Sequence, residues 1–217
     1  MPLSLPVSLE AKSDAVSAVA VEPQVAQLLA DTSLPEPVRR FLQTGATLES
    51  IYLDAEGRWF HQGEPFVNEA LALLFTRSLV RTAGGTWMLS IPPFSYPVQV
   101  LDTPRFVRSV RLEPAAPGSD KQQVWLLLSD DTEEALQPQT LRYVEERGLY
   151  CQLHSGLCAR LLRPAYFTLA EHLEPVGSTE SPSSYELTLG SSRTSVPVCS
   201  WPEARERAET TAPASIL

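Results

Sequence analysis

The stretch SIYLDAEGRWFHQGEPF, residues 50–66, decides the fold class of this chain. Ser50–Asp54 has the composition of a β-strand, the following Ala-Glu-Gly that of a tight turn, and Arg58–His61 that of the returning strand. Because side chains alternate along a strand, Trp59 and His61 share a face. The stretch therefore predicts a β-hairpin with Trp59 in the core.

Helical periodicity flanks this hairpin on both sides. Before it, one helix is predicted over about Glu22–Ala30 and a second from Pro35 to Gly45. The apolar residues on one face of the second helix are Val38, Phe41 and Leu42. After the hairpin, leucines and a phenylalanine recur at three- and four-residue spacing from Asn68 to about Val80, with Asn68 as N-cap. Strands mixed with separate helices indicate an α+β fold class.

The rest of the chain predicts further strands and one more helix. Gln123–Ser129 is a nearly continuous apolar run, typical of a central strand buried on both faces. Helical spacing over Gly156 to about Leu173 predicts a second main helix, kinked or broken at Pro164. The other predicted strands are Thr86–Ile91, Val98–Leu101, Phe106–Leu112, Leu141–Val144, Leu149–Leu153 and Tyr185–Leu189.

Changes of composition divide the chain into five segments. The two ends are rich in small and polar residues without clear periodicity, which is typical of tails. The expected segments are a disordered N-terminal tail (1–21), a helical cap (22–48), a first α+β unit (49–113), a second α+β unit (121–190) and an irregular C-terminal tail (191–217).

Composition and charge exclude several classes of protein. The 217 residues carry a formal net charge of -9, which repels nucleic-acid phosphates and anionic lipid, so no nucleic-acid or membrane partner is expected. No apolar run approaches the roughly 18 residues that a membrane span requires, and no secretory signal is evident. Three cysteines are too few for the disulfide framework of a small secreted domain. These features predict a cytoplasmic protein.

Three segments together resemble the bacterial family known as domain of unknown function 1285. They are Asp54–Phe66 with the helix after it, the strand Leu89–Pro92 with the acidic turn of Val98–Pro104, and Leu157–Tyr166, so that the likeness covers about residues 49–174. The resemblance implies a duplicated core of two strand-plus-helix units that face each other, the C-terminal one similar to a pleckstrin-homology-like fold. It also implies a site for a small or nucleotide-like ligand between the units.

The chain departs from the family pattern at two places. Asn68 stands where the family carries an arginine, and Phe94 and Ser95 stand where it carries charged residues. Charged side chains are the groups that would recognise a polar ligand. A member whose pocket has degenerated is therefore an alternative.

Four residues are candidates for such a ligand site. Arg160 and Arg163 lie three apart on the predicted second helix, where they could clamp a phosphate or carboxylate. Asp102 and His61 complete the candidate set. The structural alternatives are that the arginines pair with nearby acids, that Asp102 stabilises a turn, and that His61 has a structural partner.

Two other kinds of site, a zinc site and a hydrolase site, have weaker support in the sequence. Cys151, His154, Cys158 and Cys199 are zinc-ligand types, but residues three apart on a strand point to opposite faces, so no metal is expected. A hydrolase would recruit Ser155, one of His154 and His61, and one of Asp54 and Asp102, yet there is no Gly-x-Ser-x-Gly motif. No glycine-rich phosphate loop is present either, and no cofactor is predicted.

The sequence thus predicts a non-enzymatic protein that binds a small anionic or nucleotide-like ligand and serves in regulation or signal transduction. The main alternative is a protein-interaction adaptor, whose flexible tails and acidic surface contact a partner protein. A hydrolase is the residual alternative.

Overall fold

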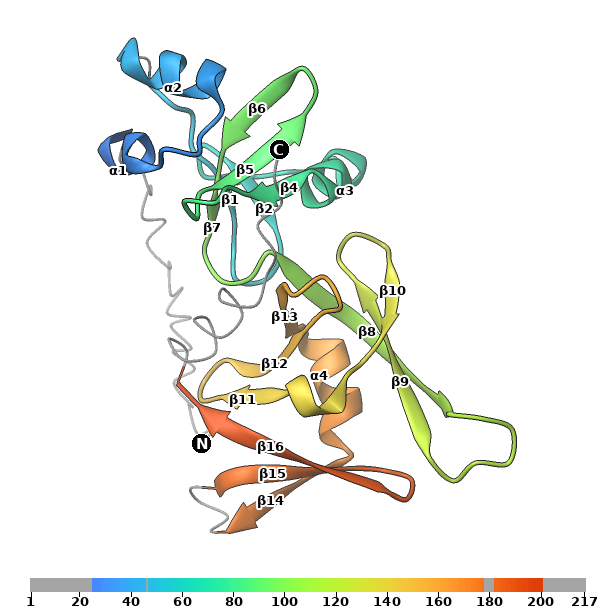
Figure 1. The fold of residues 1–217 in the computed structure, drawn as a ribbon. Coiled ribbons are helices and arrows are strands. Elements are labelled where there is room, and N and C mark those ends of the chain that lie inside the picture. The colour runs from blue at the N-terminus through green and yellow to red at the C-terminus, as the bar shows by residue number, and fades with distance from the viewer. Residues whose placement is uncertain (1–24, 46, 178–181, 201–217) are drawn as a thin grey trace, which may run out of the picture.

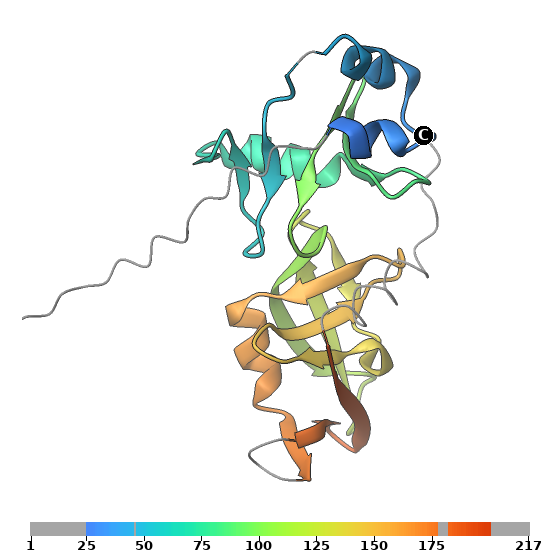
Figure 2. The same cartoon turned by 90° about the vertical axis from the view of Figure 1, so that its left-hand side faces the viewer.

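The computed structural model describes residues 25–45, 47–177 and 182–200, which form a mixed α and β structure dominated by strands. Figure 1 shows an N-terminal part with three helices and two small sheets, and a C-terminal part with one large sheet and α4. In Figure 2, β8 leads from the first part into the second. The predicted α+β class is confirmed. The expected tail over 1–21 and the start of the first helix lie outside the described residues.

Two short helices, α1 (Val25–Ala30) and α2 (Glu36–Gln43), pack on the N-terminal part, as predicted. A proline in the first turn of α2 is compatible with helix because the first amides have no intrahelical partner. The helices contribute to a buried cluster of Leu34, Val38, Leu42, Leu48 and Met88. Phe41, which was expected on the buried face of α2, is 45% exposed.

Asp31 ties this helical pair to the strands below it. Its carboxylate accepts hydrogen bonds from the Ser33 amide at 2.9 Å and from the hydroxyls of Ser33 and Thr82, each at 2.5 Å. Burial raises the pKa of Asp31, but the hydrogen bonds from Ser33, Thr82 and Thr86 prevail and bring it well below its ordinary value. Gly84 packs so closely that a Cβ there would lie 2.0 Å from Asp31 Oδ1.

We expect Asp31→Asn to lower the free energy of unfolding at pH 7 by about 1–3 kcal/mol, because buried donors lose a charged acceptor. A lowered folded-state pKa stabilises the protein above the unfolded-state value near 3.8, and this stabilisation is lost as the pH falls through the folded-state pKa. The difference between variant and wild type should therefore shrink below about pH 4. Urea unfolding at pH 7 and pH 3 measures it.

The control for this variant is Glu36→Gln, which removes only an exposed ion pair with Arg40. It should cost less than about 0.5 kcal/mol. Equal stability of the Asp31 variant and wild type at pH 7 would contradict the assignment of Asp31 as an anchor.

The predicted hairpin is present as β1 (Ile51–Leu53) and β2 (Trp59–His61), with Leu53 opposite Trp59. Trp59 is only 2% exposed, so its predicted place in the core is confirmed. Its indole nitrogen donates to the Thr76 hydroxyl at 3.0 Å, which joins the hairpin to the helix behind it. The sheet is completed by β3 (Glu64–Pro65) beside β2 and by β7 (Gln99–Val100), which runs parallel to β1.

The helix after the hairpin, α3 (Glu69–Arg77), begins as predicted, since the Asn68 side chain accepts a hydrogen bond from the Leu71 amide at 3.1 Å. It ends earlier than the predicted Val80 because the next residues pair as strand β4 (Leu79–Arg81). There Leu79 is buried in the core instead of continuing a helix face. The three-stranded sheet is completed by β5 (Trp87–Ile91) and β6 (Phe94–Pro97).

The C-terminal part is built on nine strands in the order β10-β9-β8-β13-β12-β11-β16-β15-β14. The helix α4 (Arg163–Ala170) packs against β8, and a 3-10 turn (Pro138–Thr140) precedes β11. The strands are β8 (Arg105–Pro114), β9 (Gln122–Leu128), β10 (Glu133–Ala135), β11 (Arg142–Val144), β12 (Gly148–Gln152), β13 (Cys158–Leu161), β14 (Leu173–Gly177), β15 (Pro182–Leu189) and β16 (Ser192–Cys199).

Three predictions for this part were wrong. The helix predicted over Gly156–Leu173 is a strand followed by a shorter helix: β13 pairs in parallel with β8, and Pro164 lies in the first turn of α4 and not at a kink. The strand β9 is not buried on both faces, because it is second from the sheet edge and its residues alternate in burial. Residues 192–199, expected to be an irregular tail, form β16 between β11 and β15. Residues 201–217 lie outside the described residues.

The two parts share an order of strand pairing. In the N-terminal part, β1, β2 and β3 pair in succession, α3 follows, β4, β5 and β6 pair in succession, and β7 returns parallel to β1. In the C-terminal part, β11, β12 and β13 pair in succession, α4 follows, β14, β15 and β16 pair in succession, and β16 returns parallel to β11. A glycine with positive φ lies at the turn after the first strand of each, Gly57 (77°) and Gly148 (96°).

The two parts meet through the first residues of β8. Phe106 is completely buried. Although it lies on β8 of the C-terminal sheet, its side chain belongs to the N-terminal core cluster that contains Leu53 and Trp59. Gly57 lies against the Phe106 ring, where a Cβ would come within 2.9 Å of Cδ2. The β1–β2 turn therefore packs tightly against the start of β8. In the described part of the chain, no helix combines the length and apolarity needed to cross a bilayer.

Candidate functional site

A buried carboxylate lies where the two parts of the molecule join. Asp102 stands between β7 and β8, and its side chain has no exposed surface. Its Oδ2 lies 3.3 Å from Arg160 Nη1, its Oδ1 lies 3.6 Å from Arg147 Nη1, and the Tyr150 hydroxyl donates to it at 3.1–3.2 Å. A buried charge of this kind requires such partners, because desolvation alone would be costly.

Arg160 holds several groups of both parts together. Besides Asp102, it donates to the Ala55 carbonyl at 2.9 Å and to the Arg147 carbonyl at 3.1 Å. Its Nη1 also lies 3.7 Å from Glu56 Oε1. Its side chain is 17% exposed, so most of this guanidinium is committed to the protein itself. Arg160 therefore fastens the β1–β2 turn to β13.

The environment of Asp102 has opposing effects on its charge. Burial raises the pKa of Asp102 above its ordinary value, while Arg160, Tyr150 and Arg147 act to lower it. Burial and the Asp102 charge raise the pKa of Tyr150, so the phenol stays protonated and donates its hydrogen. Asp102, predicted as a ligand residue with turn stabilisation as the alternative, instead forms a charged junction between the two parts.

A pocket of about 420 Å³ opens beside this junction. It is called the arginine pocket below. All but one of its residues come from the C-terminal part, and Glu56 of the β1–β2 turn is the exception. They are Glu56, Tyr143, Glu146, Arg147, Gly148, Arg160, Leu161, Leu162, Arg163, Tyr166 and Phe167.

Arg163 is the first residue of α4 and lies in the arginine pocket with its guanidinium 5.4 Å from the Phe167 ring centroid. Among the described residues, no carboxylate forms an ion pair with it. Arg160 and Arg163 do not share a helix face, because Arg160 lies on β13 and only Arg163 lies on α4. They nevertheless line the same pocket, approached from a strand and from a helix.

His61 is not brought together with the other candidates. Its Nε2 lies 2.6 Å from Glu49 Oε2, and its ring contacts Phe66 edge-on at 6.5 Å between centroids. It does not line the arginine pocket. The geometry therefore gives His61 the structural partner that was the alternative to a ligand role.

Several residues of the pocket were missed from the sequence. Arg147 could have been found, because it lies in the turn between two strands that the sequence predicted. Tyr143, Tyr166 and Phe167 carried no signal beyond ordinary apolar periodicity. Which aromatic residues meet at this pocket depends on how β11 and α4 pack, and local sequence does not determine that packing.

The departures from the family pattern lie away from this pocket. Asn68 caps α3, Phe94 is 74% exposed at the start of β6, and Ser95 follows it. None of the three lines the arginine pocket. The substitutions therefore leave its side chains unchanged.

The metal and hydrolase candidates are dispersed in the structure. In the described ranges, no three histidine, cysteine, aspartate or glutamate side chains are grouped as metal ligands would be. Cys151 is buried, and His154 Nδ1 lies 3.1 Å from Glu134 Oε1. Both nominated aspartates are engaged by arginines, Asp54 by Arg58 and Asp102 by Arg160.

Comparison with known proteins identifies the fold. No family model matches the sequence, and no curated protein matches it. A solved DUF1285 family protein from Silicibacter pomeroyi DSS-3 is similar, with a TM-score of 0.53 and 19% identity, over 73% of this chain and 84% of that one. Another from Shewanella baltica OS155 has a TM-score of 0.44 and 22% identity, over 57% of this chain and 91% of that one. The resemblance to this family is confirmed, at the level of the fold.

Proposed function

We propose that the arginine pocket binds a small anionic ligand and that the protein is a non-enzymatic binding or regulatory protein. The observation that carries this proposal is Arg163, a guanidinium in a pocket without an acidic partner among the described residues. The guanidinium lies over the Phe167 ring, and its planar fork suits paired hydrogen bonds to a carboxylate or phosphate. Arg160 serves as framework, because Asp102 balances its charge.

The lining of the pocket favours an anion of low charge. Three arginines face two glutamates, Glu56 and Glu146, so the formal charge of the lining is +1 (3 minus 2). A triphosphate would meet strong repulsion from both glutamates, whereas a carboxylate or a phosphate diester, each with one negative charge, would meet much less. Tyr143, Tyr166 and Phe167 supply an aromatic wall. A monoanion attached to an apolar or aromatic group therefore fits best.

The test is a thermal-shift and calorimetric titration with 3-phenylpropionate and methyl phenyl phosphate, a singly charged diester, on wild type and Arg163→Gln. Ligand at 100 times its dissociation constant should stabilise wild type by about 2.7 kcal/mol. Loss of the paired hydrogen bonds in Arg163→Gln should weaken binding at least about tenfold. The matched control is Arg40→Gln, which removes one positive charge from exposed α2 and should bind as wild type does.

Equal titrations of Arg163→Gln and wild type would overturn the ligand proposal and favour the adaptor alternative. That alternative is supported by the apolar side chains that α3 and the residue before its N-cap expose, Val67, Leu71 and Leu74. Such a stripe at helical spacing is typical of a surface that contacts a partner protein.

Three finer features accompany the proposal. We infer that the two parts arose by duplication, supported by their shared order of strand pairing. We also infer a pleckstrin-homology-like C-terminal part, since one helix there packs against a mostly antiparallel sheet. A cytoplasmic location and a role in signal transduction accord with the acidic composition and with a ligand-responsive pocket.

A further inference from the structure

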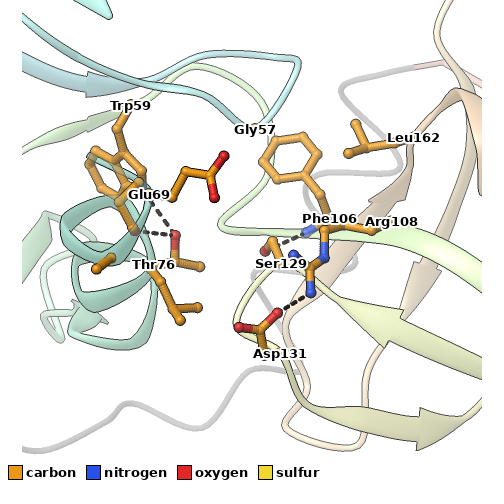
Figure 3. Close-up of a pocket in the computed structure, with 12 residues that line it drawn as sticks. Gly57, Trp59, Glu69, Thr76, Phe106, Arg108, Ser129, Asp131 and Leu162 are labelled. Carbon is orange, nitrogen blue, oxygen red and sulfur yellow. Dashed lines mark hydrogen bonds and ion pairs between the residues drawn. The ribbon is translucent and has the colours of Figure 1, made fainter. Parts of the chain in front are cut away.

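A second cavity, of about 490 Å³, lies between α3 and the start of β8. It is called the α3 groove below. Figure 3 shows side chains from both parts of the molecule around it, with Trp59 and α3 on one side and Phe106 on the other. Its lining is Gly57, Trp59, Glu69, Ala70, Ala72, Leu73, Thr76, Phe106, Arg108, Ser129, Asp131 and Leu162.

The α3 groove occupies the same place in the N-terminal part that the arginine pocket occupies in the C-terminal part. The α3 groove lies between the first turn of α3 and Gly57. The arginine pocket lies between the first turn of α4 and Gly148, the glycine at the corresponding turn. Glu69 is the first residue of α3, as Arg163 is the first residue of α4. The two cavities therefore present opposite charges at equivalent positions.

The other charges around the α3 groove are already paired. Arg108 forms an ion pair with Asp131. Arg77, at the end of α3, donates to the Asp130 carbonyl at 2.9 Å and lies 3.8 Å from Asp131 Oδ2. Glu69 has no ion pair or side-chain hydrogen bond with any described residue, and in Figure 3 its carboxylate lies between α3 and Phe106. The lining carries two acids and one arginine, a formal charge of -1 (1 minus 2).

Part of the remaining wall is apolar, and two of its polar groups are already bonded to each other. The Trp59 indole N–H is bonded to Thr76, and the Thr76 hydroxyl donates to the Ala72 carbonyl at 2.9 Å. Ala72, Leu73 and Leu162 supply the accessible hydrophobic surface, and the buried Phe106 ring lies beneath it. A ligand that fits these walls has an apolar body, and one that fits Glu69 has a cationic donor.

We propose that the α3 groove is a second binding site, selective for a primary ammonium group carried on an apolar stem. This goes beyond the anion site proposed for the arginine pocket and depends on different residues. The net charge of -9 attracts cations to the protein as a whole, and Glu69 gives that attraction a defined end point. The apolar stem lies against Leu73 and Leu162, and the ammonium donates to the Glu69 carboxylate.

The test uses a matched pair of probes, 2-phenylethylamine and 3-phenylpropionate, which share a ring and a two-carbon stem and differ in charge. Calorimetric titration of wild type should give saturable binding of the amine. Glu69→Gln should weaken the amine at least about tenfold, the loss expected for a charge-assisted hydrogen bond. Glu69→Asp, which keeps the charge in the first turn of α3, should stay within a few-fold of wild type.

Two further variants separate this proposal from the anion site. Glu64→Gln removes an exposed charge from β3 outside the α3 groove, and Arg163→Gln removes the anchor of the arginine pocket. Both variants should bind 2-phenylethylamine as wild type does, while Arg163→Gln should bind 3-phenylpropionate more weakly than wild type. Absence of amine binding at millimolar concentration, or equal binding by Glu69→Gln, would overturn the proposal whatever the carboxylate does.

Discussion

Arg160→Ala is expected to lower the free energy of unfolding by about 3–5 kcal/mol, as when one partner of a buried ion pair is removed. Asp102 would keep Arg147 and Tyr150 but lose its shortest ion pair, and the Ala55 carbonyl would lose its donor. Denaturant unfolding at pH 7 measures the change. Arg163→Ala is the matched control three residues away, and it should cost less than about 1 kcal/mol because it loses only an exposed stacking contact.

The destabilisation should also depend on pH. Burial already raises the pKa of Asp102, and removal of Arg160 raises it further. An acid with a raised folded-state pKa binds more protons when folded, so stability falls as the pH rises from the unfolded-state value through the folded-state one. Arg160→Ala should therefore be less harmful at pH 5 than at pH 8. A loss that is independent of pH would show that Asp102 is not the cause.

Gly57→Ala is expected to cost about 2–4 kcal/mol, combining a left-handed backbone with overpacking against Phe106. Gly57 has φ 77°, and a Cβ there would lie 2.9 Å from a ring atom that is completely buried. Neither the turn nor the ring can move freely, because Arg160 holds the turn and Phe106 fills the core. Thermal and urea unfolding of the variant give the measurement.

Gly63→Ala is the control that separates the cost of the contact with Phe106 from the cost of the left-handed backbone. Gly63 has φ 85°, close to that of Gly57, but a Cβ there meets no atom within 4 Å. Its cost should stay at about 1–2 kcal/mol, the price of the left-handed conformation alone. Equal losses at the two glycines would show that the Phe106 contact does not hold the two parts together.

Local chemistry made the N-terminal part predictable. The hairpin over Ser50–His61, the cap at Asn68 and the core position of Trp59 each depend on neighbours a few residues away, and all three are present. The prediction for the C-terminal part was wrong where pairing between strands distant in sequence determines the structure. Cys158–Leu161 has helix-compatible spacing, yet β8 and β12 are available on either side of it, and pairing with them makes it a strand.

The candidate site was predictable only in part, for the same reason. Arg160 and Asp102 were both singled out, and they form one ion pair across 58 positions of sequence. The presumed common helix face of Arg160 and Arg163 was wrong because Pro164 starts a helix instead of interrupting one. The roles of the two arginines then differ. Arg160 pairs with the buried Asp102, whereas Arg163 has no ion pair among the described residues. Sequence spacing has no means of separating these cases.

The position of β16 has a consequence for how the chain is made. This strand lies inside the large sheet, between β11 and β15, although it is the last described strand in sequence. A nascent chain emerging from the ribosome can complete β1–β7 early, but the C-terminal sheet stays split until Cys199 has been synthesised. Until then, the edges of β11 and β15 are unpaired and open to association with other chains. Synthesis of β16 therefore sets the moment at which these two strand edges become covered.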